Sequence, residues 1–114
     1  MVDPTTIAAA ADFYSIAAAQ GDAEAQRVLG AMHYVGDGRP RDHVEARRLL
    51  GLAAAQGDAQ AQRSLGFLVL DGDGGFLVLD GDGGLQDHME ARQLFGLAAV
   101  QGDAEAQGRL GAMY

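Results

Sequence analysis

The chain lacks cysteine altogether and contains no lysine, so all 8 of its basic side chains are arginines. Without cysteine, a disulfide framework and a thiolate metal site are both excluded. The arginines are outnumbered by 16 acidic residues, which gives a net charge of −8. Nucleic acids and anionic membrane surfaces are bound by basic faces, so we expect neither as a partner.

Long apolar runs are also missing. No stretch approaches the roughly 18 uninterrupted apolar residues that a membrane-spanning helix needs. The first 19 residues are apolar, but they have no positive segment and include Asp3 and Asp12. They do not fit a signal peptide, and we expect a helix of the mature protein there. Since no targeting signal is visible, the cytoplasm is the default location.

Motifs that support catalysis are absent as well. The chain has no HExxH, no serine or cysteine nucleophile beside a base, and no glycine-rich phosphate loop with a lysine. His43 and His88 follow equivalent Asp residues in the repeats described next, so a shared scaffold explains them better than catalysis. We expect no enzyme activity, no catalytic residue, no cofactor and no metal site.

The dominant feature is a repeated stretch. Residues 17–30 read AAAQGDAEAQRVLG, residues 53–66 read AAAQGDAQAQRSLG, and residues 98–111 read AAVQGDAEAQGRLG. Units of this kind cannot bury their apolar faces alone and stack on their neighbours. The repeats predict an all-α fold, an α-solenoid of about three antiparallel helix-turn-helix units with the last one truncated.

Local signals place the helices. Pro4 after Asp3 is typical of a helix start, because proline lacks only a donor that would have no partner there. An apolar stripe is expected on this first helix, formed by Phe13, Tyr14, Ala17 and Ala18.

Tight turns and caps are expected between helices. Gly21 ends the first helix and Asp22 caps the second, so only a very short turn separates two antiparallel neighbours. Asp42 followed by Glu45 resembles a capping box, with aspartate in place of serine or threonine. Asp87 is the equivalent cap in the last repeat.

The spacing of the repeats defines the predicted organisation. One repeat domain is expected over 1–114, with repeat one at 1–36, repeat two at 37–71, an enlarged acidic and apolar loop at 72–86, and repeat three at 87–114. The loop arises because residues 66–74 are copied letter for letter as 75–83.

Three interpretations of this duplication remain open. The second copy enlarges a loop, which costs little entropy and is the favoured interpretation. Alternatively the two copies form a β-hairpin around the glycines, or the second copy replaces the first in another chain by domain swapping. Four apolar loop residues are the candidates for self-association: Phe76, Leu77, Val78 and Leu79.

The same loop carries two weak signals for chemistry. Residues 79–85 resemble the DxDGTL motif of haloacid dehalogenase-like phosphatases, but glycine replaces the threonine and the chain has no lysine to balance a phosphoryl group. Four carboxylates suggest calcium: Asp71, Asp73, Asp80 and Asp82. An EF-hand requires glycine at position six, where this loop has Phe76. A solvated acidic loop explains both signals.

Further repeat positions identify a family. The pattern AAxQGDAxAQxxLG is followed by Gly36, Gly38 and Asp42 in repeat one, and by Gly81, Gly83 and Asp87 in repeat two. This pattern resembles the Sel-one-like repeat (SLR) family, a branch of the tetratricopeptide-like solenoids. The resemblance implies a right-handed superhelix with the first helix of each pair toward the concave side, and a role as an adaptor for other proteins.

Polar and aromatic residues of each first helix are the candidate partner-binding residues: Asp12, Tyr14, Arg47, Arg48, Arg92 and Gln93. Arginine suits a peptide that carries a carboxylate, so an unidentified protein or peptide is the expected partner. The competing interpretation is that Arg48 and Arg92 are solvated or paired with Glu45 and Glu90.

A second function also fits the sequence. The chain could serve as a structural or engineered repeat module whose duplicated segment tests insertion tolerance or drives self-association. A homo-oligomer is compatible with both functions, because the last repeat leaves an apolar end at Tyr114.

Overall fold

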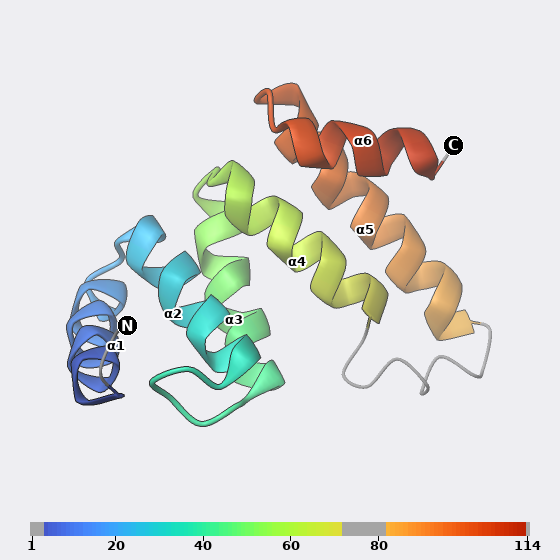
Figure 1. Cartoon of the computed structure of the whole chain (residues 1–114). Helices are drawn as coiled ribbons and strands as arrows, with labels where there is room; N and C mark the ends of the chain where they lie inside the picture. Colours follow the sequence, from blue (N-terminus) through green and yellow to red (C-terminus); the bar gives the residue numbers. More distant parts are fainter. Residues whose placement is uncertain (1–3, 72–81, 114) are drawn as a thin grey trace. The chain divides into compact units, whose positions relative to one another are not determined.

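A computed structural model of the chain describes residues 4–71 and 82–113, and within these ranges it contains helices and no strands (Figure 1). The helices are α1 (Pro4–Ala19), α2 (Ala23–Val35), α3 (His43–Ala55), α4 (Ala59–Asp71), α5 (Asp82–Val100) and α6 (Ala104–Ala112). The predicted all-α fold of paired helices is confirmed. The apolar loop residues 76–79 lie outside the described residues, so the three interpretations of the duplication stay predictions.

The chain divides into two compact units, Met1–Gln56 and Gly57–Tyr114. In the first unit α2 packs against both α1 and α3, and in the second unit α5 packs against both α4 and α6. Each unit therefore consists of three helices in sequence order. The predicted repeat boundaries stay predictions.

The tight turns form as the sequence predicts. Each has a glycine with a φ of 93°, a backbone conformation that other residues avoid: Gly21, Gly57 and Gly102. The aspartate after each glycine accepts a hydrogen bond from the third backbone N–H that follows, as Asp22 does from Ala25 at 2.8 Å. Glycine and aspartate together therefore end one helix and start the next within three residues at each turn.

The predicted capping box at α3 forms only in part. The Asp42 side chain accepts from the Glu45 backbone N–H at 3.0 Å, which confirms the cap. The reciprocal bond of a capping box, from the Asp42 backbone N–H to the Glu45 carboxylate, does not form. The Asp42 N–H donates instead to the His33 carbonyl at 2.9 Å, and the Glu45 carboxylate accepts from Arg48. A guanidinium is a stronger donor to a carboxylate than a backbone amide that already has an acceptor.

The start of α5 differs from the prediction. The helix begins at Asp82, five residues before the expected cap at Asp87, so residues 82–86 of the predicted loop are helical. Adding a residue to an existing helix is far easier than nucleating one, and no proline stands between 82 and 87 to stop the helix.

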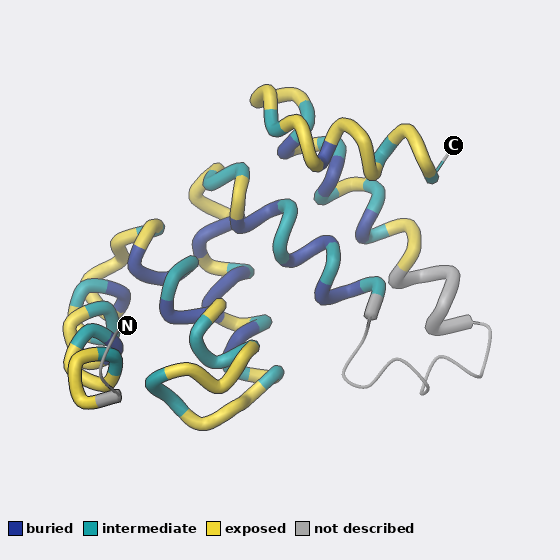
Figure 2. The backbone as a smooth tube through the Cα atoms, viewed as in Figure 1, coloured by how far each residue is buried: buried dark blue, intermediate teal, exposed yellow. Residues whose placement is uncertain are grey.

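The buried face of α1 also differs from the predicted stripe. Ala11 and Ala18 are buried and Tyr14 is half-buried, which places the face at i, i+3 and i+7 (Figure 2). Phe13 is 70% exposed, so its place in the stripe was wrong. Apolar residues lie on more than one face of α1, so the sequence alone did not decide which face is buried. The contact with α2 buries the face that carries alanine.

Each unit has a core in which helices approach closely. In the first unit Leu29 of α2 packs with Leu49 of α3, and a Cβ atom on Gly30 would lie 3.0 Å from the Leu50 Cγ. In the second unit a Cβ on Gly66 of α4 would lie 3.0 Å from the ring of the fully buried Phe95. Glycine therefore allows a close approach at both positions, because a Cβ atom would be crowded against the neighbouring side chain and that side chain would have to shift.

Candidate functional site

Paired glutamines join the helices of each unit. Gln26 is buried, donates from Nε2 to the Ala18 carbonyl at 3.3 Å, and accepts at Oε1 from Gln56 Nε2 at 2.8 Å. In the second unit Gln101 Nε2 donates to Gln62 Oε1 at 2.9 Å. Sequence reasoning missed these bonds, although the signal was present in the two glutamines that flank each QGDAxA stretch. The pairs are structural, and they rigidify the surfaces beside them.

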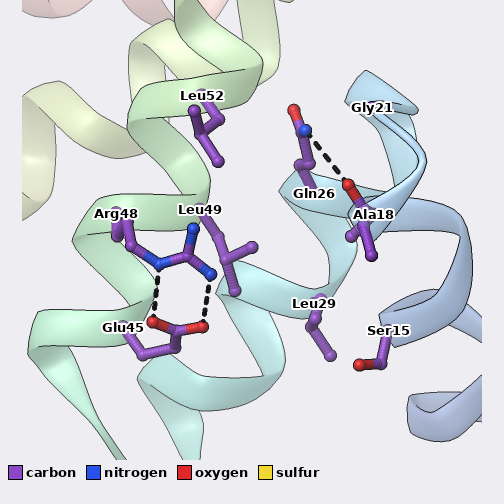
Figure 3. A pocket seen from close by; sticks show the side chains of 10 residues that line it. Ser15, Ala18, Gly21, Gln26, Leu29, Glu45, Arg48, Leu49 and Leu52 are labelled. Atoms are coloured by element: carbon purple, nitrogen blue, oxygen red, sulfur yellow. Dashed lines mark hydrogen bonds and ion pairs between the residues drawn. The ribbon is translucent and has the colours of Figure 1, made fainter.

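A hollow of about 300 Å³ lies between α1, α2 and α3 of the first unit (Figure 3). Its lining includes Ser15 and Ala18 from α1, Leu29 from α2, and Arg48 and Leu52 from α3. Small residues on α1 leave the space open, while leucines provide an apolar surface. The accessible lining is more polar than apolar, so the hollow is a groove that offers hydrogen-bonding groups together with a smaller apolar surface.

Arg48 and Glu45 form the polar edge of this groove (Figure 3). Arg48 donates from Nε and from Nη2 to the two carboxylate oxygens of Glu45, at 2.8 and 2.7 Å. This bidentate bond lowers the pKa of the Glu45 carboxyl and raises the pKa of the Arg48 guanidinium. Both side chains are substantially exposed, so the pair contributes little to stability, but it holds the guanidinium in a defined orientation.

The other predicted residues of the first unit have different surroundings. Asp12 forms an exposed ion pair with Arg39 at 2.6 Å. Tyr14 packs against the core cluster that contains Leu29, and Arg47 is half-buried on α3. Of these residues and Arg48, only Arg48 lies at the groove.

The remaining predicted residues belong to α5 in the second unit. Arg92 is half-buried, whereas Gln93 is exposed at the repeat position that Arg48 occupies in the first unit. The chemistry at this position therefore changes from a cation to a neutral amide between the two units. The predicted self-association residues 76–79 lie outside the described part of the chain.

An apolar residue is exposed at one repeat position of α1, α3 and α5. Ile16 is 63% exposed, Leu52 is 42% exposed and Leu97 is 53% exposed. A position that stays apolar without being buried in its own unit is a candidate for contact with a partner. Sequence reasoning missed it, because the candidate binding residues were limited to polar and aromatic ones.

The second unit has a smaller hollow of about 280 Å³, lined by residues of α6 and by Phe67 of α4. The guanidinium of Arg109 lies over the Phe67 ring at 4.8 Å, and Phe67 meets Phe95 edge to face at 5.1 Å. The cation therefore covers an aromatic pair, an arrangement typical of packing at a surface.

The described residues contain neither a metal site nor a membrane-spanning helix. No group of three histidine or acidic side chains within 4–71 and 82–113 is arranged to hold an ion. Likewise, none of the described helices is sufficiently long and apolar to cross a bilayer.

The sequence profile of the Sel1 repeat matches residues 7–22, 23–58 and 59–103, which is most of the chain. The chain belongs to the Sel1 repeat family. The second match covers α2 and α3, so the family's repeat unit, as matched, contains the two helices that meet at Gly30 and Leu50.

Solved structures of Sel1 repeat proteins are similar to this chain. A Sel1 repeat protein from Oxalobacter formigenes is 33% identical, with a TM-score of 0.77, and the match covers 94% of this chain and 40% of the other. A protective antigen of uropathogenic Escherichia coli strains with an SLR fold is 27% identical, with a TM-score of 0.59, over 95% of this chain and 29% of the other. This chain thus spans less than half the length of either protein. No curated protein matches the sequence.

Proposed function

We propose that this Sel1 repeat chain is a non-catalytic scaffold that binds an extended segment of another protein in the groove between α1, α2 and α3. The observation that carries the proposal is the groove itself, in which an oriented guanidinium stands at the edge of an apolar surface. A peptide segment can match both features of the groove, because its apolar side chains suit the apolar surface and its polar atoms can accept from the guanidinium.

The apolar part of the groove provides the contact area. Leu29 and Leu49 line it but are almost fully buried in the core of the unit, so they support the groove and are held in place before a ligand arrives. Leu52 is partly exposed at the rim and gains burial when a ligand covers it. A rigid apolar surface of this kind binds without the entropic cost of ordering itself.

Arg48 provides the selection for charge. The bonds to Glu45 occupy Nε and one hydrogen of Nη2, so the remaining guanidinium hydrogens are available to an acceptor on the ligand. An acidic side chain is favoured because charged hydrogen bonds are the stronger ones. Glu45 also weakens this preference, since its negative charge repels the ligand, and we therefore expect moderate affinity.

A library of randomised dodecapeptides displayed on phage, selected against the whole chain, tests the proposal. We expect enrichment of peptides that combine an acidic residue with apolar residues. Arg48→Ala should weaken a synthetic copy of the selected peptide by about tenfold or more, because a hydrogen bond to a charged group is worth about 1.5–3 kcal/mol.

Arg41→Ala is the matched control, because Arg41 is exposed in the connection before α3 and lies outside the groove. Its affinity for the peptide should equal that of the unmodified chain. Equal affinity of the Arg48→Ala and unmodified chains would refute the role of Arg48, and unchanged binding by Leu52→Asp as well would refute the groove.

A further inference from the structure

The contact between α2 and α3 has three parts that recur along the chain. Leu49 packs against Leu29, Leu50 covers Gly30, and Gln56 donates to Gln26. Leu49 is only 3% exposed as a result. Gln26, Leu29 and Gly30 come from the second half of the GDAxAQxxLG stretch, and their partners come from the helix that follows it.

The contact between α4 and α5 repeats this arrangement. Phe95 covers Gly66, as Leu50 covers Gly30, and Gln101 donates to Gln62, as Gln56 donates to Gln26. The two units therefore use the same interface, with a glycine, a large apolar residue and a pair of glutamines in the same register.

One half of this interface is present on α6 and is not covered within the described residues. Gly111 occupies the position of Gly30 and Gly66, yet it is exposed, and a Cβ atom there would meet nothing within 4 Å. Gln107 is also exposed and donates from Nε2 to the Ala99 carbonyl at 3.1 Å, as Gln26 does to Ala18. The Oε1 atom of Gln107 therefore corresponds to the Gln26 Oε1 atom that accepts from Gln56.

The complementary half is present on α1. Phe13 occupies the position of Leu49 and is 70% exposed. Tyr14 stands where Leu50 and Phe95 stand, and Gln20 stands where Gln56 and Gln101 stand. Phe13, Tyr14 and Gln20 therefore provide the half of the interface that is complementary to the half on α6.

We propose that two copies of the chain associate head to tail, with α1 of one copy packed on α6 of the other. In this interface Phe13 packs against Leu110, the part of Tyr14 that its own unit leaves exposed covers Gly111, and Gln20 donates to Gln107. This interface is independent of the peptide groove, because none of its residues on α1 or α6 lines the groove.

This interface has consequences for the size of the assembly. The two surfaces are different, so a pair still presents one unpaired α1 surface and one unpaired α6 surface and can add a further copy. The same contact is weaker between chains than within one chain, because association loses translational and rotational freedom. We therefore expect a mass that rises with concentration rather than a fixed dimer.

Sedimentation equilibrium from about 10 μM to about 1 mM tests the proposal, because this range covers weak association constants. The mean mass should rise from the 11.8 kDa of one chain and pass that of two chains. Phe13→Asp and Gly111→Gln should each weaken association by about tenfold or more, because each removes or blocks a buried apolar contact. A monomer mass across the whole range would overturn the proposal.

Two control variants separate this interface from general changes of the surface. Ala8→Asp adds the same charge to α1, but at an exposed position where Val44 and Met89 also stay exposed. Gly108→Gln lengthens a side chain on α6, but at the position where Arg27 and Arg63 stand in the other repeats. Both controls should associate like the unmodified chain, and loss of association in them would overturn the assignment.

Mixing the two interface variants gives the sharpest test. Phe13→Asp keeps an intact α6 surface and Gly111→Gln keeps an intact α1 surface, so an equimolar mixture should form a pair that stops at two chains. Failure of the mixture to pair, while the unmodified chain associates, would show a different interface and would overturn the head-to-tail arrangement. Circular dichroism of each variant, expected to match the unmodified chain, confirms that its helices are intact.

Discussion

The two units form the same interface between consecutive helices although the connections that lead to it differ. In the first unit 7 residues, 36–42, separate α2 from α3, and two of them, Gly36 and Gly38, have a positive φ. The second unit has 10 residues between Asp71 and Asp82, and the longer distance between repeats in sequence comes from a copied nonapeptide. The contact at the glycine and the glutamine pair recurs in both. The helix surfaces, rather than the connection, therefore determine how the helices pair.

The units also differ in what fills the interface. The first unit uses leucines and alanines and leaves a groove beside Arg48, whereas the second unit uses Phe95 against Phe67. The positions of this aromatic pair are taken by Ala31 and Leu50 in the first unit, and neither of these residues lines the groove. The aromatic pair and the groove are therefore separate differences between the units.

The largest expected effect compares two phenylalanines of the same chain. Phe95→Ala should lower the free energy of unfolding by about 3–5 kcal/mol, because it leaves a cavity in the core of the second unit. Phe13→Ala should change it by less than about 0.5 kcal/mol in dilute monomer, because that ring is mostly exposed. Urea unfolding followed by circular dichroism measures both, and similar losses in the two variants would contradict the described burial.

A smaller effect is expected from the cap of α6. The hydrogen bond from the Ala106 backbone N–H, assisted by Arg63, lowers the pKa of the Asp103 carboxyl. Asp103→Ala should therefore cost about 1 kcal/mol at neutral pH, the usual value of an N-cap.

The pH dependence of this cap has a definite sign. Since the pKa is lower in the folded state, the unfolded state takes up the proton first as the pH falls. The contribution of Asp103 is complete above the ordinary aspartate pKa of about 3.9 and is lost as the pH falls through the lower value of the folded state. The stability difference between Asp103→Ala and the unmodified chain should shrink below about pH 4, and a constant difference down to pH 2 would contradict this cause.

The smallest effect is expected from the connection itself. Deletion of residues 75–83 restores the regular spacing of the repeats, and loop shortening on this scale changes the free energy of unfolding by about 0.6 kcal/mol or less. Urea unfolding of the shortened chain measures the change. A loss of several kcal/mol would show that the copied segment stabilises the second unit, and the comparison between the units would then fail.

Local sequence predicted most of the helix boundaries. Glycine at a φ of 93° and aspartate as the next residue act through their own backbone and side chain, so the turns at Gly21, Gly57 and Gly102 follow without knowledge of the rest of the fold. The start of α5 was missed because helix propagation into residues 82–86 depends on weak local preferences rather than on one residue.

The site was less predictable than the helices. Arg48 was identified as a polar residue of a first helix, but its groove depends on small residues of α1 and on leucines of two other helices. The glutamine pairs join residues about thirty or more positions apart, as Gln26 and Gln56 are. Sequence spacing shows that both glutamines recur, but not that they meet.

The sequence by itself determined the all-α class, the tight turns, the caps at Asp22, Asp42 and Asp103, and the family, because each of these depends on residues close together in the chain or on their repetition. Only the tertiary structure decided that Phe13 is exposed, that Phe95 is buried, and that Arg48 stands beside a groove. The physical reason is that burial depends on which helix lies opposite. Phe13 and Leu49 occupy the same repeat position. Leu49 of α3 is covered because α2 lies against it, whereas Phe13 of α1 is open because α1 has no preceding helix among the described residues.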